Sequence, residues 1–319
     1  MVTGGAGYIG AHVVRELQSA GLSVAVLDNL STGVRGFVPE DVPFIEADLL
    51  NTDAVREALA THSVSGVIHI AGFKFAGISV EKPLHTYEQN VTAMMSLLHA
   101  MEAEGVGKIV FSSSSSVYGN AASGLVTEDD SFNPTSPYGE SKVIGEWLLR
   151  NQGTAKGLVH TSLRYFNVVG SGEPSLPDVS PYNLLSMVFA GLESDRLPVI
   201  FGNDYETPDG TCVRDYIHVA DLAKAHVGAA RRMDRGDAIE SAYNLGSGTG
   251  TSVAEMMSAV SRVTGIDFSP EVGPRRAGDP ARVVASGEKA SRDIDWAMTH
   301  SLEGMIRSAF DARSNLPPA

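Results

Sequence analysis

Tyr138 and Lys142 are the two side chains of this 319-residue chain with the clearest capacity for chemistry. Residues four apart on a helix lie one above the other on the same face, so the phenol and the ammonium would be neighbours. A free tyrosine titrates near ~10, and an adjacent ammonium lowers the pKa of a phenol because it stabilises the phenolate. Such a pair can take a proton from an alcohol while a hydride leaves the same carbon. The spacing alone is weak evidence, because a surface tyrosine beside a solvated lysine produces it too.

The residues directly before Tyr138 are typical of a helix N-terminus. Ser136 is a favourable N-cap residue, and Pro137 suits the first helical position. Further upstream, the serine run Ser112–Ser116 directly follows the apolar segment 108–111. At the carboxyl edge of a parallel strand, such hydroxyl groups face the ligand crevice. A flexible linker is the alternative interpretation of so many serines.

Three glycines near the N-terminus, Gly4, Gly7 and Gly10, are spaced every third residue and predict a dinucleotide-binding turn. Glycine lets the backbone approach a pyrophosphate, which then lies on the N-terminus of the following helix. Asp28 ends the next expected strand, about 20 residues further on, as this fingerprint requires. Its carboxylate would bind ribose hydroxyls and repel a 2′-phosphate, so the sequence favours NAD over NADP. Asp48 ends an expected third strand and could contact the adenine, although a surface loop explains it nearly as well.

Apolar segments alternate with amphipathic ones through the N-terminal half. The expected strands are 23–27, 67–70 and 108–111, and the expected helices are 8–20, 52–60 and 86–104. This alternation is typical of βαβ units, whose right-handed crossovers give a doubly wound parallel sheet, the α/β Rossmann architecture. Only Met1 and Val2 precede Thr3, so we expect a compromised first strand or a missing piece.

The second half of the sequence is less regular and predicts a smaller mixed α/β lobe. Loops are expected at 170–181, 202–211 and 270–280, with a helix at 183–193 and a short strand at 198–201. We therefore expect an NAD-binding Rossmann domain over residues 1–168 and a substrate-binding lobe over residues 169–319. A segment near 213–230 would return to the Rossmann domain.

The composition excludes several classes of function. A formal net charge of −14 argues against a nucleic-acid partner, because affinity for phosphate backbones comes mostly from Lys and Arg. The single cysteine, Cys212, cannot form an intramolecular disulfide and fits a reducing compartment. No apolar run approaches the ~20 residues that span a membrane, and no signal peptide is evident, so we expect a cytoplasmic protein. The nine histidines show no metal-ligand spacing, so no metal site is expected.

Several motifs, which follow one another to about residue 280, resemble those of one known family. They are the opening glycines, the serine segment and the pair at 138–142, together with 27–30, 71–74, 163–167, 201–205, 213–219, 243–246 and 274–279. With these motifs the chain resembles the extended short-chain dehydrogenase/reductases, and among them the UDP-glucose 4-epimerases. The segments that carry Arg214 and Arg276 are much more specific signals than the glycine spacing.

The resemblance implies roles for the matched positions. Tyr138 would take the proton from the sugar 4-hydroxyl, and Lys142 would hold the nicotinamide ribose and depress the tyrosine pKa. Ser114 would hydrogen-bond the same 4-oxygen, with Ser115 as the second choice. The implied NAD-binding residues are Gly4, Gly7, Tyr8, Ile9, Gly10, Asp28, Asn29, Asp48, Leu49, Ala71, Gly72, Lys74, Asn90 and Tyr165.

A UDP-sugar site is implied as well. Arg214 and Arg276 would pair with the diphosphate, for which planar guanidinium donors are suited, and Asp279 would hold the uridine ribose. The implied substrate-binding residues are Ser114, Tyr138, Asn167, Asn183, Leu184, Phe201, Arg214, Arg276 and Asp279. The implied reaction is the reversible inversion of C4 in a UDP-hexose through a 4-keto sugar, which rotates before the hydride returns.

Two departures from the family pattern bear on the sugar. Ile78 stands where a polar residue is more usual, and Val283 stands where enzymes for non-acetylated sugars often carry tyrosine. A smaller residue at position 283 leaves room for a 2-acetamido group. We therefore expect that UDP-N-acetylglucosamine is accepted in addition to UDP-glucose.

Two other functions fit the same scaffold. A nucleotide-sugar 4,6-dehydratase or decarboxylase is the nearer alternative, but a dehydratase needs an acid and a carboxylate directly after the serine strand. This chain continues there with serines, then Val117 and Tyr118. A catalytically inactive nucleotide-binding sensor should lack the tyrosine or the lysine, and both are present. The family often dimerises through a helix pair, so we expect a homodimer through 86–104 and the helix that begins near Tyr138.

Overall fold

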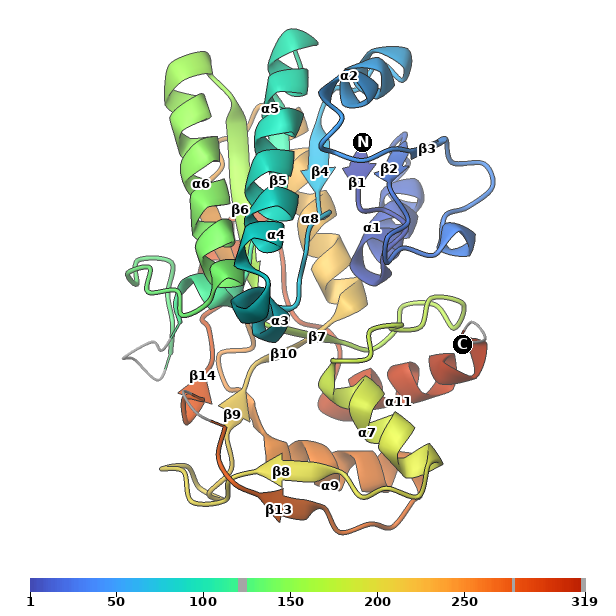
Figure 1. The fold of residues 1–319 in the computed structure, drawn as a ribbon, viewed down its shortest axis with the longest axis vertical. Coiled ribbons are helices and arrows are strands. Elements are labelled where there is room, and N and C mark those ends of the chain that lie inside the picture. Colours follow the sequence, from blue (N-terminus) through green and yellow to red (C-terminus); the bar gives the residue numbers. More distant parts are fainter. Residues whose placement is uncertain (120–124, 277–278, 317–319) are drawn as a thin grey trace.

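The computed structural model describes residues 1–119, 125–276 and 279–316, and a seven-stranded parallel sheet lies at its centre (Figure 1). The strand order is β11-β6-β5-β4-β1-β2-β3. The strands are β1 (Val2–Thr3), β2 (Val26–Asp28), β3 (Phe44–Glu46), β4 (Val67–His69), β5 (Lys108–Ser112), β6 (Val159–Tyr165) and β11 (Ala242–Leu245). This confirms the predicted doubly wound sheet, and β1 is as short as the sequence indicates. Chain order reverses between β1 and β4, and such a switch point opens a crevice at the carboxyl ends of the strands.

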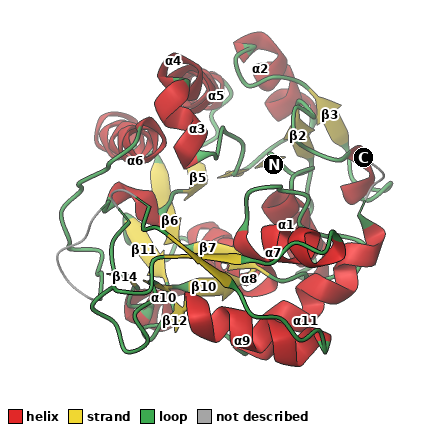
Figure 2. Ribbon diagram, turned by 60° about the horizontal axis from the view of Figure 1, so that its bottom comes forward, coloured by secondary structure: helices red, strands yellow, loops and turns green. Residues whose placement is uncertain are grey.

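Helices cover both faces of this sheet, each over its own hydrophobic cluster (Figure 2). α1 and α8 pack together on one face, and α2 and α5 pack together on the other. Along β5 the side chains alternate between the clusters, because Val110 belongs to the first and Ile109 and Phe111 to the second. The helices are α1 (Tyr8–Ser19), α2 (Thr52–Thr61), α5 (Ala93–Ala103), α6 (Pro137–Lys156) and α8 (Val219–Asp234).

The helix expected over 86–104 is present but interrupted. α4 (Pro83–Tyr87) begins with a proline at its first position and passes through a π-helical turn, η2 (Glu88–Thr92), into α5. A π-helical turn rotates the residues on either side of it relative to a regular helix. Asn90 therefore comes to face α6 and the segment after β4, which α3 (Ala76–Glu81) follows.

A second lobe lies below the large sheet in Figure 1 and holds a cluster of its own. It contains α7 (Leu184–Glu193), α9 (Val253–Thr264), α11 (Leu302–Ala312) and three small sheets. These sheets pair β8 (Val199–Phe201) with β13 (Glu271–Gly273), β7 (Asn167–Val169) with β10 (Tyr216–His218), and β9 (Val213–Arg214) with β12 (Thr251–Ser252) and β14 (Arg282–Val283). Short connecting elements are η1 (Arg35–Phe37), η3 (Ser115–Val117), α10 (Glu288–Ile294) and η4 (Arg313–Asn315). After β10 the chain returns to the large sheet through α8 and β11.

Candidate active site

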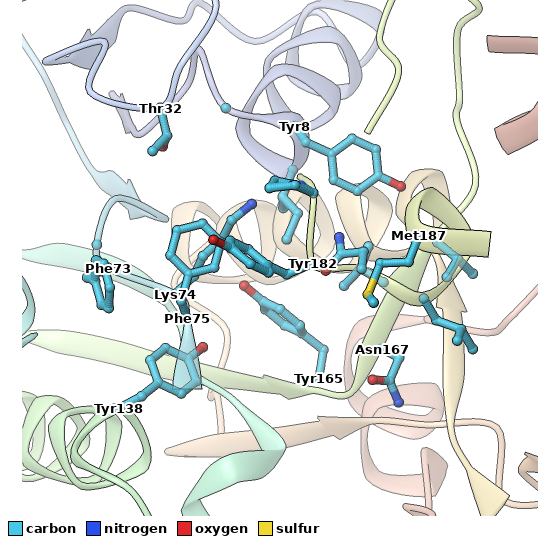
Figure 3. Close-up of a pocket in the computed structure, with 18 of the residues that line it drawn as sticks. Tyr8, Thr32, Phe73, Lys74, Phe75, Tyr138, Tyr165, Asn167, Tyr182 and Met187 are labelled. Atoms are coloured by element: carbon cyan, nitrogen blue, oxygen red, sulfur yellow. The ribbon is translucent and has the colours of Figure 1, made fainter. Parts of the chain in front are cut away.

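A cavity of about 1390 Å³ runs along the carboxyl edge of the large sheet and into the second lobe. Its walls come from the glycine turn, β2, the segment after β4 and α6 on one side and from α7, β8 and β9 on the other. Figure 3 shows side chains of both lobes around it, with Tyr138 and Tyr165 near one end and Asn167 and Met187 beyond them. One continuous space therefore joins the predicted dinucleotide site to the predicted UDP-sugar site.

The glycine turn is as tight as a close approach to phosphate requires. Gly4 has φ +74°, and a Cβ there would lie 2.6 Å from the backbone nitrogen of Ala71. A Cβ on Gly10 would lie 2.0 Å from the carbonyl oxygen of Gly4, so any side chain would push α1 away from β1. α1 begins at Gly7 without a side-chain cap, which leaves the N–H groups of its first turn for a ligand.

Asp28 lies at the end of β2 and faces the same cavity. Its carboxylate accepts hydrogen bonds from the backbone N–H of Ala6 (3.0 Å) and of Leu30 (2.9 Å). Burial raises the pKa of Asp28, and these two hydrogen bonds oppose the rise. Asp48 lines the cavity too, where it accepts a hydrogen bond from Asn29 (2.8 Å).

The tyrosine and the lysine stand on the first turns of α6. Ser136 caps this helix by accepting a hydrogen bond from the N–H of Gly139 (3.2 Å), as the sequence predicts. The Lys142 ammonium lies 5.7 Å from the centre of the Tyr138 ring and donates to the carbonyl oxygen of Ser112 (2.9 Å). Burial lowers the pKa of Lys142 to about 8, and the carboxylate of Glu146 opposes this fall.

The sequence predicts a lowered pKa for Tyr138, but in the structure this pKa is raised. Burial raises the pKa of this phenol, and a hydrogen bond with Ser114 opposes the rise. Desolvation is the larger of these two effects, and the Lys142 ammonium lies over the ring of Tyr138.

The serine run is an ordered part of the protein, so the flexible-linker interpretation is wrong. Ser112 ends β5, and Ser112, Ser113 and Ser114 are buried. Ser114 accepts a hydrogen bond from the N–H of Ser116 (3.1 Å) and so caps η3. Because Ser114 also contacts the Tyr138 hydroxyl, the geometry favours it over Ser115 as the partner of the tyrosine.

Most of the residues predicted to bind the cofactor line the cavity. These are Gly4, Gly7, Tyr8, Ile9, Gly10, Asp28, Asn29, Asp48, Leu49, Ala71, Gly72, Lys74 and Tyr165. Asn90 is not among the lining residues. Its amide exchanges hydrogen bonds with the backbone of Phe73 (2.6 and 2.9 Å) and donates to Ser141 (2.9 Å). Asn90 thus ties the loop after β4 to α6, and its side chain has no donor left for the cavity.

The predicted substrate residues come together at the other end. Tyr138, Asn167, Asn183, Leu184, Phe201, Arg214, Arg276 and Asp279 all line the cavity, and Ser114 lies behind Tyr138. Arg214 forms an ion pair with Asp279 (3.3 Å), and the Arg276 guanidinium lies 4.0 Å from the centre of the Phe201 ring. The side chains of Asn167 and Asn183 donate to the carbonyl oxygen of Asp215 (2.9 Å) and to Asp178 (2.6 Å), respectively.

Val283 and Ile78, the two residues that depart from the family pattern, lie outside the wall of the cavity. Val283 is half-buried in β14, where it pairs with Arg214, and it is not among the residues that line the cavity. Ile78 is half-buried in α3 and is likewise absent from the cavity wall.

Sequence reasoning missed an aromatic group that crosses the cavity. The rings of Phe75 and Tyr182 are 5.0 Å apart at an angle of 70°, and Phe73 packs against Phe75 at 5.4 Å. The three rings come from opposite lobes and from loops without a periodic pattern, so only tertiary structure could bring them together. Lys74 lies among them, and its pKa is lowered by desolvation against the opposing effect of Asp178.

The described residues offer neither a metal site nor a membrane-spanning helix. No group of three or more His, Cys, Asp or Glu residues among them could hold a metal ion. None of the helices that the structure describes is long and apolar enough to cross a membrane.

The fold and the cavity define a class, namely a dinucleotide-dependent α/β protein with a separate lobe for a second ligand. The model of the NAD dependent epimerase/dehydratase family matches residues 1–246, and this chain belongs to that family. The chain is 42% identical to the UDP-glucose 4-epimerase of Bacillus subtilis, over 99% of this chain and 96% of that one. It is 42% identical to the UDP-glucose 4-epimerase of Corynebacterium glutamicum, with the same coverage.

Solved structures give the same result. A crystal structure of a UDP-glucose 4-epimerase superimposes with a TM-score of 0.94 at 39% identity, and covers 98% of this chain and 96% of the other. The UDP-Glc/GlcNAc 4-epimerase of Campylobacter jejuni superimposes with a TM-score of 0.87 at 33% identity, over 99% and 98%. NAD is the cofactor of this family, and the uncapped start of α1, the glycine turn and Asp28 fit a dinucleotide without a 2′-phosphate.

Proposed function

We propose that this chain interconverts UDP-glucose and UDP-galactose by inverting C4 of the hexose. One observation carries the proposal. Tyr138 and Lys142 line the same cavity as the glycine turn on one side and the arginines of the second lobe on the other. A hexose linked to a diphosphate that Arg214 and Arg276 hold would place its reacting carbon near the tyrosine. The full-length similarity to UDP-glucose 4-epimerases supports this reaction.

The residues of this chain would handle the proton. When bound, NAD would be held by the glycine turn and Asp28 and would supply the redox chemistry as a reversible hydride acceptor. Tyr138 takes the proton of the 4-hydroxyl and later returns it, and Ser114 hydrogen-bonds the same oxygen. Lys142, fixed on the carbonyl oxygen of Ser112, holds a positive charge beside the developing phenolate. The protein would bind the diphosphate tightly and the hexose weakly. The hexose could therefore rotate and present its other face to the cofactor.

A dehydratase is disfavoured by what surrounds Tyr138. Two acids of α6, the helix that carries Tyr138, have other partners, since Glu140 accepts a hydrogen bond from Tyr87 and Glu146 is paired with Arg164. The residues after β5 that contact or approach the tyrosine are serines. Elimination of water across C5 and C6 needs an acid and a base at that place, and serine hydroxyls supply neither at neutral pH.

We also propose that the 2-acetamido sugars are accepted. The valine at position 283 is small, and it sits beside Arg214 at the border of the substrate lobe. Val283 is absent from the cavity wall, so its influence would act through the position of β14 and not through contact. Val283→Tyr is the matched variant, and it should reduce turnover of the acetylated sugar more than turnover of UDP-galactose.

We propose that the protein is a cytoplasmic homodimer. Four large apolar side chains stand exposed on neighbouring helices, namely Val80 (62%), Leu84 (82%), Met95 (44%) and Trp147 (44%). The helices α3, α4, α5 and α6 stand together in Figures 1 and 2, and burial of these side chains against a second copy would remove them from water. Light scattering of the wild type and of Leu84→Asp tests this, with a dimer and a weakened dimer as the expected results.

The activity is tested with two separate incubations, one with UDP-galactose and one with UDP-N-acetylgalactosamine. We expect UDP-glucose from the first and UDP-N-acetylglucosamine from the second. Tyr138→Phe should lose at least ~100-fold in rate, because a positioned base is removed. A stable keto sugar as product would point to the dehydratase, and near-normal turnover by Tyr138→Phe would refute the assigned base.

A further inference from the structure

Three polar side chains, those of His226, Lys142 and Tyr165, meet at Ser112. The serine side chain lies 2.8 Å from the Nε2 atom of His226, which belongs to α8 on the far face of the sheet. His226 is fully buried and Ser112 is 1% exposed. The carbonyl oxygen of Ser112 accepts the hydrogen bond from Lys142.

The carbonyl oxygen that accepts from His226 determines where the hydrogens of His226 and Ser112 lie. The Nδ1 atom of His226 lies 2.9 Å from the carbonyl oxygen of Leu222, which can only accept, so Nδ1 carries a hydrogen. Burial lowers the pKa of His226 to about 4, so the ring is neutral at neutral pH. The Nε2 atom therefore holds a lone pair, and the hydroxyl of Ser112 must donate to it.

The hydrogen bond from Ser112 to His226 also determines the direction of the Tyr165 hydroxyl hydrogen. The hydroxyl of Tyr165 interacts with the side chain of Ser112. Because the hydrogen of Ser112 is given to His226, the serine oxygen can only accept, so Tyr165 would be the donor of this pair. The Tyr165 ring lies 6.2 Å from the His226 ring, lines the cavity, and is close enough to Tyr138 to feel its charge. The proton of Tyr165 would then point to the serine, and the lone pairs of the Tyr165 oxygen would be left for a ligand in the cavity.

We propose that His226 is a positioning residue for the reaction at Tyr138. Through Ser112, it orients the hydroxyl of Tyr165 so that this second tyrosine accepts hydrogen bonds and does not compete as an acid. The backbone carbonyl of the same serine accepts the hydrogen bond from Lys142, so the residue that His226 contacts also lies against the lysine. This inference rests on the proposed function for its catalytic consequence, but the proton positions can be tested without it.

The kinetic test compares two substitutions of similar size. His226→Met fills the space without an acceptor, and His226→Gln places an amide oxygen near the position of Nε2. With UDP-galactose we expect His226→Met to lower kcat about five- to tenfold, the effect of one hydrogen bond, and to leave KM within about twofold. His226→Gln should recover most of the lost kcat. Equal losses in both variants, or a loss in KM alone, would overturn the positioning role.

A double-substitution cycle separates this chain of hydrogen bonds from a general loss of packing. Tyr165→Phe removes the hydroxyl that the chain is proposed to orient. If His226 acts through Ser112 on that hydroxyl, the combined His226→Met/Tyr165→Phe variant should have nearly the kcat of Tyr165→Phe alone. Additive losses would show that His226 acts on something else.

The proton positions are measured directly by NMR of protein labelled with ¹⁵N-histidine, with His226→Gln used to assign the signal. We expect a neutral His226 ring with its hydrogen on Nδ1, unchanged from pH 8 to pH 6. A hydrogen on Nε2, or a protonated ring, would overturn the inference whatever the reaction. If this result holds and UDP-galactose is not converted, the proposed function fails and the hydrogen-bond assignment stands.

Discussion

Two consecutive serines at the end of β5 anchor two different buried networks. Successive side chains on a strand point to opposite faces, so Ser112 reaches α8 and Ser113 reaches α6. The α8 network is neutral and consists of Ser112, His226 and Tyr165. The α6 network is ionic, because Ser113 donates to Glu146 (2.6 Å) and Glu146 is paired with Arg164 (2.6 Å).

The two networks differ in how they act on the surroundings of Lys142. Glu146 stands one helical turn beyond Lys142, and its carboxylate favours the ammonium that burial disfavours. That carboxylate is tolerated inside the protein because Arg164 binds it through two nitrogens. The neutral network brings no charge near the cavity and acts only through the direction of its hydrogens. We therefore expect changes on the α6 side to affect stability and ionisation, and changes on the α8 side to affect turnover.

The largest effect should come from breaking the ionic network. Arg164→Met leaves Glu146 buried without its partner, and we expect a loss of about 3–5 kcal/mol in the free energy of unfolding. Urea denaturation measures this loss. The double variant Arg164→Met/Glu146→Gln removes both charges and should recover part of the stability. A single variant as stable as the wild type would remove the distinction between the two networks.

The second effect concerns pH. Lys142 loses its proton as the pH rises through its pKa of about 8, so the proposed reaction should slow on the alkaline side. Glu146→Gln removes the carboxylate that raises this pKa, so the decline in kcat should begin at lower pH. His226→Gln changes no charge and should leave the alkaline limb where it is in the wild type. Identical pH profiles for wild type and Glu146→Gln would contradict the role given to the carboxylate.

The smallest effects distinguish the two serines themselves. Ser113→Ala removes a hydrogen bond to a charged group and should cost about 1.5–3 kcal/mol of stability with little change in kcat. Ser112→Ala should lower kcat a few-fold, because Tyr165 and His226 lose their link, at a cost in stability of about 1 kcal/mol. Calorimetry and steady-state kinetics on the two variants measure both quantities. The reverse pattern would mean that the two faces have been assigned wrongly.

The parts of this molecule that the sequence predicts are those that depend on neighbouring residues. The glycine turn, the short β1, the Ser136 cap and Asp28 at the end of β2 each follow from local chemistry. The serine run is the intermediate case. Its position after a strand is evident from the sequence, but the partner of each hydroxyl depends on helices far away in the chain.

Other features depend on contacts that no local pattern encodes. The π-helical turn η2 places the amide of Asn90 on Phe73, so a residue expected at the cofactor holds a loop instead. The pairing of β14 with β9 keeps Val283 out of the cavity wall. The phenol of Tyr138 has a raised pKa because its burial, which spacing cannot reveal, outweighs the hydrogen bond with Ser114.

The most direct test of the account follows deuterium placed at C4 of UDP-galactose. C4 gives up this hydrogen together with its electron pair and receives the same hydrogen back, whereas Tyr138 handles only the hydroxyl proton. Incubation with the wild type in ordinary water should give UDP-glucose that keeps its deuterium at C4, and Tyr138→Phe should give at least ~100-fold less product in the same time. Loss of deuterium to water, or its retention with equal turnover by both proteins, would contradict the central claim that Tyr138 deprotonates the hydroxyl at the carbon whose configuration is inverted.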